Sequence, residues 1–169
     1  MIKLNKVYHM DNLELLKQMD DESVDLIYCD ILYNTGKKFR DYNDKLGTPN
    51  QAIEWYEPRL IEMKRVLKNT GSIYLQCDYR LVHYLKVEMD KIFGLGNFRN
   101  ELIWHYKRWT GKSNKYQSLH DNILFYTKAN TKEYTFNVQL KDYTEGSKKR
   151  KESTLHRFKD GKKYLVTEK

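Results

Sequence analysis

The sequence contains little cysteine and little proline, with two residues of each among 169. Two cysteines cannot form the disulfide framework of a small secreted domain, and Cys29 and Cys77 each lie in an apolar run typical of a reduced core thiol. The spacing of His, Cys, Asp and Glu resembles no metal site. The chain also lacks a signal peptide and an apolar run long enough to span a bilayer. We therefore expect a cytoplasmic protein with no metal and no membrane partner.

The charge of the chain is unevenly distributed, and its basic excess lies toward the C-terminal end. The formal net charge is +8, to which residues 1–103 contribute −1, residues 104–128 contribute +4 and residues 141–169 contribute +5. This asymmetry predicts a polyanionic partner, although basic runs are also common as solvated surface. Aromatic side chains among the cations of the first basic stretch favour nucleic acid, because they can stack on bases. The candidate nucleic-acid-binding residues are Trp104, Lys107, Arg108, Trp109, Lys112 and Lys115.

The length suits a single α/β body. Gly71 is suited to a left-handed cap at the end of a helix. Because strands and helices alternate over the first hundred residues, we expect a mostly parallel sheet. Beyond residue 130 the apolar periodicity disappears, so we expect that segment not to fold alone. Apolar periodicity predicts strands at 6–9, 26–29, 72–77, 102–106 and 122–127, and helices at 13–19, 51–67 and 80–93.

A carboxylate and an aromatic residue follow the second predicted strand, at Asp30 and Tyr33. In open α/β sheets, ligands bind in the crevice beyond the carboxyl ends of the strands, which makes both residues candidates for a binding site. The simpler alternatives are a turn residue that ends a strand and an aromatic residue that packs. Residues 34–51 are too polar to pack and too long for a simple connection, which is typical of a lid or binding loop.

The surrounding sequence resembles a known family of enzymes. Tyr8-His-Met-Asp-Asn-Leu-Glu14 and Val24-Asp-Leu-Ile-Tyr-Cys-Asp-Ile-Leu-Tyr-Asn-Thr-Gly36 are similar to the opening of bacterial amino-methyltransferases that modify adenine or cytosine in DNA. The similarity continues through Asn69-Thr-Gly-Ser-Ile-Tyr74, the strand ending at Trp104 and His120-Asp-Asn-Ile-Leu-Phe-Tyr126, and it covers roughly residues 1–128. The order of motifs resembles the permuted (beta) class, in which the catalytic motif precedes the cofactor motif. The resemblance implies a Rossmann-like methyltransferase fold.

The resemblance also implies roles for particular residues. Asp30 and the carbonyl of Ile31 would accept hydrogen bonds from the exocyclic amine of a base flipped out of double-stranded DNA, and Tyr33 would stack on that base. The candidate catalytic residues are therefore Asp30, Ile31, Leu32 and Tyr33. Asp11 and Asp30 would bind S-adenosylmethionine, the methyl donor, although Asp11 alone is equally consistent with a helix cap. Adenine N6 is favoured, because cytosine enzymes of this kind more often carry serine at the position of Asp30. The implied protein is a restriction-modification methyltransferase.

Two departures from the family pattern shape these expectations. Ile31 and Leu32 stand where the family usually has two prolines, so the loop is less rigid while its carbonyls remain. The family's glycine-rich cofactor motif is missing after residue 128, and Gly94-Leu95-Gly96 follows a predicted helix instead of a strand. We therefore expect an N-terminal portion, incomplete at the cofactor-motif half, which would need a partner chain carrying that motif. On this interpretation, residues 1–128 form the catalytic-motif domain and 129–169 begin a basic target-recognition region.

Other interpretations remain open at this level. The chain could be a truncated or non-catalytic DNA-binding subunit, a cytosine N4 methyltransferase or an RNA methyltransferase. The sequence does not reveal the recognition sequence or whether the chain forms a homodimer.

Overall fold

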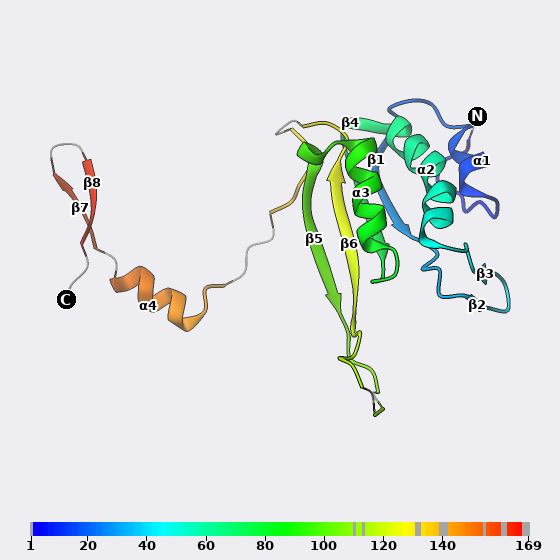
Figure 1. The fold of residues 1–169 in the computed structure, drawn as a ribbon. Helices are drawn as coiled ribbons and strands as arrows, with labels where there is room; N and C mark the ends of the chain where they lie inside the picture. Colours follow the sequence, from blue (N-terminus) through cyan, green and yellow to red (C-terminus); the bar gives the residue numbers. More distant parts are fainter. Residues whose placement is uncertain are drawn as a thin grey trace. The chain divides into compact units, whose positions relative to one another are not determined.

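The computed structural model describes residues 2–109, 111–112, 114–130, 133–138, 142–153, 155–159 and 162–166. It divides the chain into two compact units, Met1–Thr135 and Phe136–Lys169. The elements of the first unit, in chain order, are α1 (Asn12–Leu16), β1 (Val24–Asp30), β2 (Lys37–Lys38), β3 (Asn43–Asp44), α2 (Pro49–Val66), β4 (Leu67–Cys77), α3 (Val82–Phe93), the short 3-10 helix η1 (Leu95–Asn97), β5 (Phe98–His105) and β6 (His120–Thr127) (Figure 1).

The main sheet is mixed, with the strand order β1-β4-β6-β5. β1 pairs with β4 in parallel, whereas β6 runs antiparallel to both β4 and β5. The α/β class is as expected. Three of the four strands of this sheet run in the same direction, as expected of a mostly parallel sheet, but β6 runs the opposite way, so one of the three strand pairings is parallel. The reason for the direction of β6 is local: the described residues between β5 and β6 contain no crossover helix, and such a connection returns the chain antiparallel. Consequently the start of β6 lies at the same edge of the sheet as the carboxyl ends of β1 and β4.

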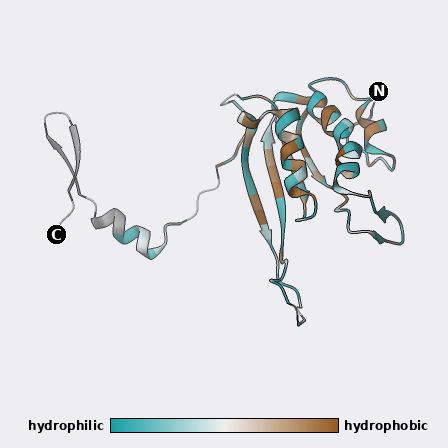
Figure 2. Ribbon diagram, in the orientation of Figure 1, coloured by the Kyte–Doolittle hydropathy of each residue, from teal (hydrophilic) through white to brown (hydrophobic). Residues whose placement is uncertain are grey.

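The hydrophobic core lies between the sheet and two helices. Side chains on one face of β4 and β6, such as Ile73 and Leu124, are almost completely buried together with Leu60 of α2 and Leu85 of α3. Figure 2 shows hydrophobic and hydrophilic stretches alternating along α2 and α3, which is the pattern of helices with one buried face. Thr48 begins α2 with a capping box, in which its hydroxyl accepts from the Gln51 amide and the Gln51 side chain accepts from the Thr48 amide.

Two expectations about local structure are wrong. Residues 6–9 are not a strand in the structure. Gly71 does not cap a helix, because α2 ends at Val66 and the chain continues directly into β4, which contains Gly71. A Cβ atom at this position would lie 2.9 Å from the Lys68 carbonyl oxygen and 3.1 Å from that of Val24, so the glycine permits close approach of β1 and β4.

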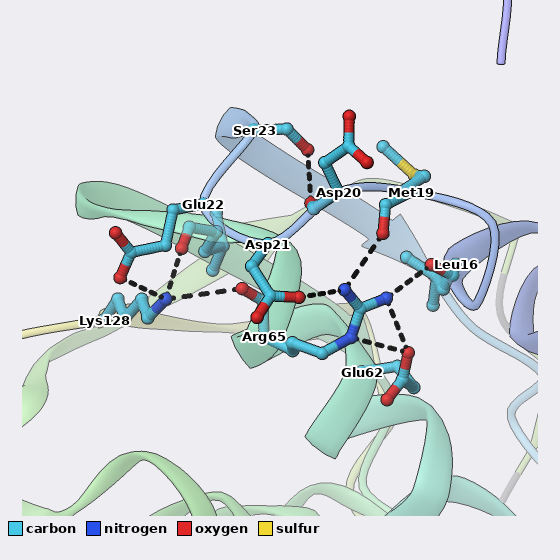
Figure 3. Close-up of polar contacts among 10 residues, drawn as sticks. Leu16, Met19, Asp20, Asp21, Glu22, Ser23, Glu62, Arg65 and Lys128 are labelled. Atoms are coloured by element: carbon cyan, nitrogen blue, oxygen red, sulfur yellow. Dashed lines mark hydrogen bonds and ion pairs between the residues drawn. The ribbon is translucent and has the colours of Figure 1, made fainter. Parts of the chain in front are cut away.

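Arg65 and Lys128 fasten the turn between α1 and β1 to the end of α2 (Figure 3). The Arg65 guanidinium donates to the carbonyls of Leu16 and Met19, at 2.7 and 2.9 Å, and pairs with Glu62. The Lys128 ammonium donates to the Leu67 carbonyl at 2.6 Å and to the Arg65 carbonyl at 3.3 Å. Carbonyls at a helix C-terminus have no partner within the helix, so a cation placed there stabilises this end of α2.

The second unit contains α4 (Glu145–Ser153) and an antiparallel hairpin of β7 (Leu155–Lys159) and β8 (Lys162–Val166). Of the helices that the structure describes, none combines the length and hydrophobicity that crossing a membrane requires.

Candidate active site

Asp30 and Tyr33 meet at the carboxyl end of β1. Asp30 is the last residue of the strand, and the Ile31 amide still donates to the Gln76 carbonyl of β4 at 3.4 Å. The chain then turns so that the Tyr33 hydroxyl donates to Asp30 Oδ1 at 3.0 Å. Burial, followed by the hydrogen bond to Asp30 and its charge, raises the pKa of Tyr33, so its hydroxyl stays protonated. The structure therefore brings together the two residues on which the sequence interpretation depends.

The polar loop after Tyr33 is ordered by two side chains. The buried carboxylate of Asp44 accepts from the amides of Asn34 and Thr35, at 2.9 and 3.0 Å. The Asn34 side chain in turn accepts from the Leu46 amide and donates to the Gly47 carbonyl, at 2.8 and 2.9 Å. Asn34 adopts a left-handed conformation (φ 55°), which asparagine tolerates better than most residues. Residues 34–47 are therefore a folded loop with an internal hairpin of β2 and β3.

A cavity of about 750 Å³ opens beside this loop. All four predicted catalytic residues line it, and so does Asp11. Its aromatic lining comes from three elements, with Phe39 and Tyr42 stacked on each other in the hairpin (ring centroids 4.7 Å apart) and Trp55 on α2. The aromatic lining residues are Tyr33, Phe39, Tyr42, Trp55 and Tyr56. The volume falls in the range usual for small-molecule sites, about 300–1,000 Å³.

Asp11 both caps α1 and lines the cavity. Its carboxylate accepts from the Leu13 amide at 2.8 Å and from the buried guanidinium of Arg59 at 2.7 Å. Burial opposes ionisation, but the hydrogen bonds from Arg59 and Leu13 prevail and lower the pKa of Asp11. Arg59 is itself held against the Trp55 ring, with its central carbon 3.4 Å from the ring centroid. The helix cap and the cavity wall are thus the same side chain.

Ile31 and Leu32, which stand where the family has prolines, differ in whether their backbone carbonyls accept a hydrogen bond. The Tyr56 hydroxyl donates to the Leu32 carbonyl at 2.8 Å. Within the described part of the chain, no hydrogen bond to the Ile31 carbonyl is present. Ile31 therefore offers an acceptor beside Asp30, whereas the Leu32 carbonyl is already used to hold the loop against α2.

A second cavity, of about 440 Å³, lies on the other side of Tyr33. Tyr33 and Thr35 line both cavities. Four cationic side chains line the second one, namely Lys37, Arg80, Arg108 and Lys115. We call it the basic cavity. Arg108 and Lys115 were predicted from the sequence to bind nucleic acid, and the structure places both in the lining of this cavity together with Tyr33, the hydrogen-bond partner of Asp30.

The other predicted nucleic-acid-binding residues are exposed. Trp104 lies on β5 with 62% of its surface accessible, and Trp109 is 96% exposed in the connection to β6, which Figure 2 shows as largely hydrophilic. Lys107 and Lys112 are also exposed in this connection. The guanidinium of Arg108 stacks on the Tyr106 ring at 4.6 Å. Among the described residues, no three His, Cys, Asp or Glu side chains are grouped so that they could hold a metal ion.

Sequence reasoning missed a polar network behind Tyr33. Asp121, at the start of β6, accepts from the Tyr33 hydroxyl at 3.3 Å and from the Gln76 amide at 3.2 Å. Gln76 also donates to the Tyr33 oxygen at 2.9 Å, and Tyr106 donates to Asp121 at 3.2 Å. The position of Asp121 could have indicated this network, because the start of an antiparallel strand lies at the same edge of the sheet as the ends of its neighbours. The sequence analysis did not predict that the strand of Asp121 is antiparallel.

Comparisons with known proteins show the family of the chain. The sequence profile of a DNA methylase family, N6_N4_Mtase, matches residues 24–166. The chain belongs to this family. Type II methyltransferase M.HpaI of Haemophilus parainfluenzae is 33% identical to it over 126 residues, which are 75% of this chain and 39% of that protein. DNA adenine methyltransferase YhdJ of Escherichia coli is 33% identical over 78% of this chain and 43% of its own length.

Solved structures of the same kind show a similar fold. The PvuII DNA methyltransferase, described as cytosine-N4-specific, superposes with a TM-score of 0.53 at 15% identity, over 73% of this chain and 49% of that one. The complex of M1.HpyAVI with SAM gives a TM-score of 0.53 at 17% identity, over 81% of this chain and 60% of that one. This chain spans less than half of the two curated relatives named above, so their whole activities do not pass to it directly.

Proposed function

We propose that this chain supplies the catalytic-motif half of a restriction-modification methyltransferase of the permuted class. The reaction would transfer a methyl group from S-adenosylmethionine to the exocyclic amine of a base flipped out of double-stranded DNA, with adenine N6 the favoured target. One observation carries the proposal: Tyr33, which is hydrogen-bonded to Asp30, lines both the cavity with aromatic walls and the basic cavity.

The residues at the end of β1 match what methylation of an amine requires. A conjugated exocyclic amine is a weak nucleophile, and acceptors that bind its two hydrogens draw the nitrogen toward a tetrahedral form. Asp30 and the Ile31 carbonyl are adjacent acceptors for those hydrogens. The Tyr33 ring would replace the stacking that a base loses when it leaves the duplex. The basic cavity would take the sugar and phosphates that accompany the base.

The larger cavity fits S-adenosylmethionine in size and lining. Aromatic rings such as Trp55 suit both an adenine ring and a sulfonium cation, and the carboxylate of Asp11 suits a hydroxyl or ammonium group. When bound, this molecule supplies a methyl group on positively charged sulfur. The chain's own residues would hold the acceptor amine in line with it at near-attack distance, and this positioning would provide much of the catalysis.

We also propose that the glycine-rich cofactor motif lies outside residues 1–169, on a polypeptide segment that we call the partner. Gly94-Leu95-Gly96 does not replace it, since Gly94 ends helix α3 and Leu95 begins η1. Isothermal titration of the isolated chain with S-adenosylmethionine tests this arrangement. We expect weak or undetectable binding alone and tight binding once the partner is added. Tight binding by the isolated chain would show that no partner is needed.

The identity of the base can be tested directly. Tritium from labelled S-adenosylmethionine should appear in N6-methyladenine when duplex DNA of mixed sequence is digested to nucleosides. Label in N4-methylcytosine would instead select the cytosine alternative, and preferential labelling of structured RNA in a competition with duplex DNA would select the RNA alternative.

A second candidate is a DNA-binding subunit without catalytic activity. The observation that favours it is the exposed, basic and aromatic connection between β5 and β6, which could bind DNA by itself. DNA binding without methyl transfer, under every partner tested, would support this candidate over the enzyme.

A further inference from the structure

Asp121 is the residue of the polar network that the proposed reaction does not use. It lies at the sheet edge where β1 and β4 end, and it lines the basic cavity. Its two carboxylate oxygens accept from three side chains. Oδ1 accepts from Tyr106, and Oδ2 accepts from Gln76 and Tyr33.

Two carboxylates lie within hydrogen-bond distance of the Tyr33 hydroxyl. Its oxygen lies 3.0 Å from Asp30 Oδ1 and 3.3 Å from Asp121 Oδ2. A phenol carries one proton and can make one strong donor bond, so the two carboxylates compete for it. The hydrogen bond to Asp30 is the shorter one in this structure.

Gln76 holds Tyr33 and Asp121 in position for the hydrogen bond between them. The Tyr28 hydroxyl donates to the side-chain oxygen of Gln76, which turns the Gln76 amide nitrogen toward Tyr33 and Asp121. That nitrogen donates to the Tyr33 oxygen, so the phenol oxygen already has a donor and must direct its own proton to a carboxylate. It also donates to Asp121 and holds that carboxylate beside the phenol.

A substrate amine needs Asp30 as a strong acceptor. On the proposed function, an amine hydrogen must bond to the Asp30 carboxylate, and the bond from the Tyr33 hydroxyl to Oδ1 of that carboxylate draws off negative charge and weakens it as an acceptor. We propose that Asp121 is a positioning residue that accepts the Tyr33 hydroxyl when the amine takes Asp30. The exchange requires only a rotation of the phenol O–H bond, because both acceptors lie within hydrogen-bond distance of the same oxygen. This inference rests on the proposed function and adds a residue to it.

The test is a double-mutant cycle on Asp121→Asn and Tyr33→Phe, measured as kcat and KM for methyl transfer to duplex DNA by the chain with its partner. Asp121→Asn should lower kcat by about tenfold or more while KM for DNA changes less, because the lost interaction matters at the reacting group. Phenylalanine keeps the ring but removes the competing hydroxyl. In the Tyr33→Phe background, Asp121→Asn should therefore have little further effect.

Asp90→Asn is the matched control. Asp90 also accepts a tyrosine hydroxyl from β6, that of Tyr126 at 2.6 Å, but away from both cavities. It should change thermal stability without lowering kcat, when both are measured well below the unfolding temperature. Equal and additive losses from Asp121→Asn in the wild-type and Tyr33→Phe backgrounds would overturn the inference, because a merely structural role needs no hydroxyl on that ring.

Different results would refute the role of Asp121 and the proposed function. Turnover by the wild-type chain that is lost in Asp30→Ala, combined with additive Asp121 effects, would refute the role of Asp121 alone. Absence of turnover in the wild-type chain with every partner, and absence of a fluorescence rise from 2-aminopurine placed at the target base, would refute the proposed function and the inference together.

Discussion

At the residue scale, two side chains of the candidate active site each have two structural roles. Asp11 caps a helix and lines a cavity, and Tyr33 contacts Asp30 while it forms the wall between two cavities. Sequence reasoning singled out Asp11, Asp30 and Tyr33, which line one cavity, because a strand followed by these residue types is a local pattern. It did not single out Gln76 and Asp121, whose contacts with Tyr33 depend on pairings between strands far apart in the sequence.

Cys29 provides a prediction at this scale. Burial, followed by the charge of Asp30, raises the pKa of its thiol to about 11, from an ordinary value of 9.0. A pKa raised in the folded state means that the neutral thiol stabilises the fold fully below pH 9 and that this contribution is lost as the pH rises toward 11. Between pH 8 and 10, urea unfolding should show a loss of about 1 kcal/mol that Cys29→Ala lacks. Equal pH dependence in the two proteins would contradict this assignment.

At the element scale, the sequence located most helices and strands but not their pairing. Residues 26–29, 72–77 and 122–127 were all predicted as strands, and each lies within an observed strand. Parallel or antiparallel direction cannot be read from strand composition, because it depends on the connection. Gly71 illustrates a second limit: the glycine is required by the approach of another strand, and its own sequence neighbourhood resembles a helix cap.

The loop of residues 34–47 should depend on Asp44. Asp44→Ala leaves the partly buried amides of Asn34 and Thr35 without their acceptor, which typically costs about 1–3 kcal/mol. We expect much faster cleavage by trypsin at the basic residues of the loop. Asp41→Ala is the control, because the Asp41 side chain is 88% exposed and should leave the cleavage rate unchanged. Similar rates for the two variants would show that Asp44 does not hold the loop.

The hydrogen bonds of Lys128 at the end of α2 give another prediction at this scale. Lys128→Met removes the donor to the Leu67 and Arg65 carbonyls from a position where the lysine side chain is only 14% exposed. The free energy of unfolding should fall by about 1–3 kcal/mol in urea titrations. Lys17→Met removes an exposed pair with Glu14 and should cost less than about 0.5 kcal/mol. The account of this contact is wrong if the two variants are equally stable.

At the scale of the whole molecule, charge and fold are distributed differently. Residues 1–103 are close to neutral and contain most of the core, whereas the basic excess follows from residue 104 onward. The sequence predicted this division, because net charge is additive along the chain. It could not predict that Arg108 and Lys115 share a cavity with Lys37 and Arg80, since that depends on the fold.

DNA binding should therefore depend strongly on salt. Replacing Arg108 and Lys115 together by glutamine should reduce the slope of log K against log salt concentration by about 2, if each contacts one phosphate. Lys91→Gln is the control, since this exposed lysine on α3 pairs with Glu88 and does not line the basic cavity. An unchanged slope in the double variant would remove these two residues from the DNA interface.

The most direct test of the central claim compares two aspartates of one strand. Asp30 ends β1, and Asp25 lies near its start, with its side chain 75% exposed and paired with Lys68. With the partner supplied, Asp30→Ala should lower kcat for methyl transfer to duplex DNA by about 100-fold or more, because the acceptor for the substrate amine is lost. Asp25→Ala should retain nearly full activity. Retention of wild-type activity by Asp30→Ala would contradict the account.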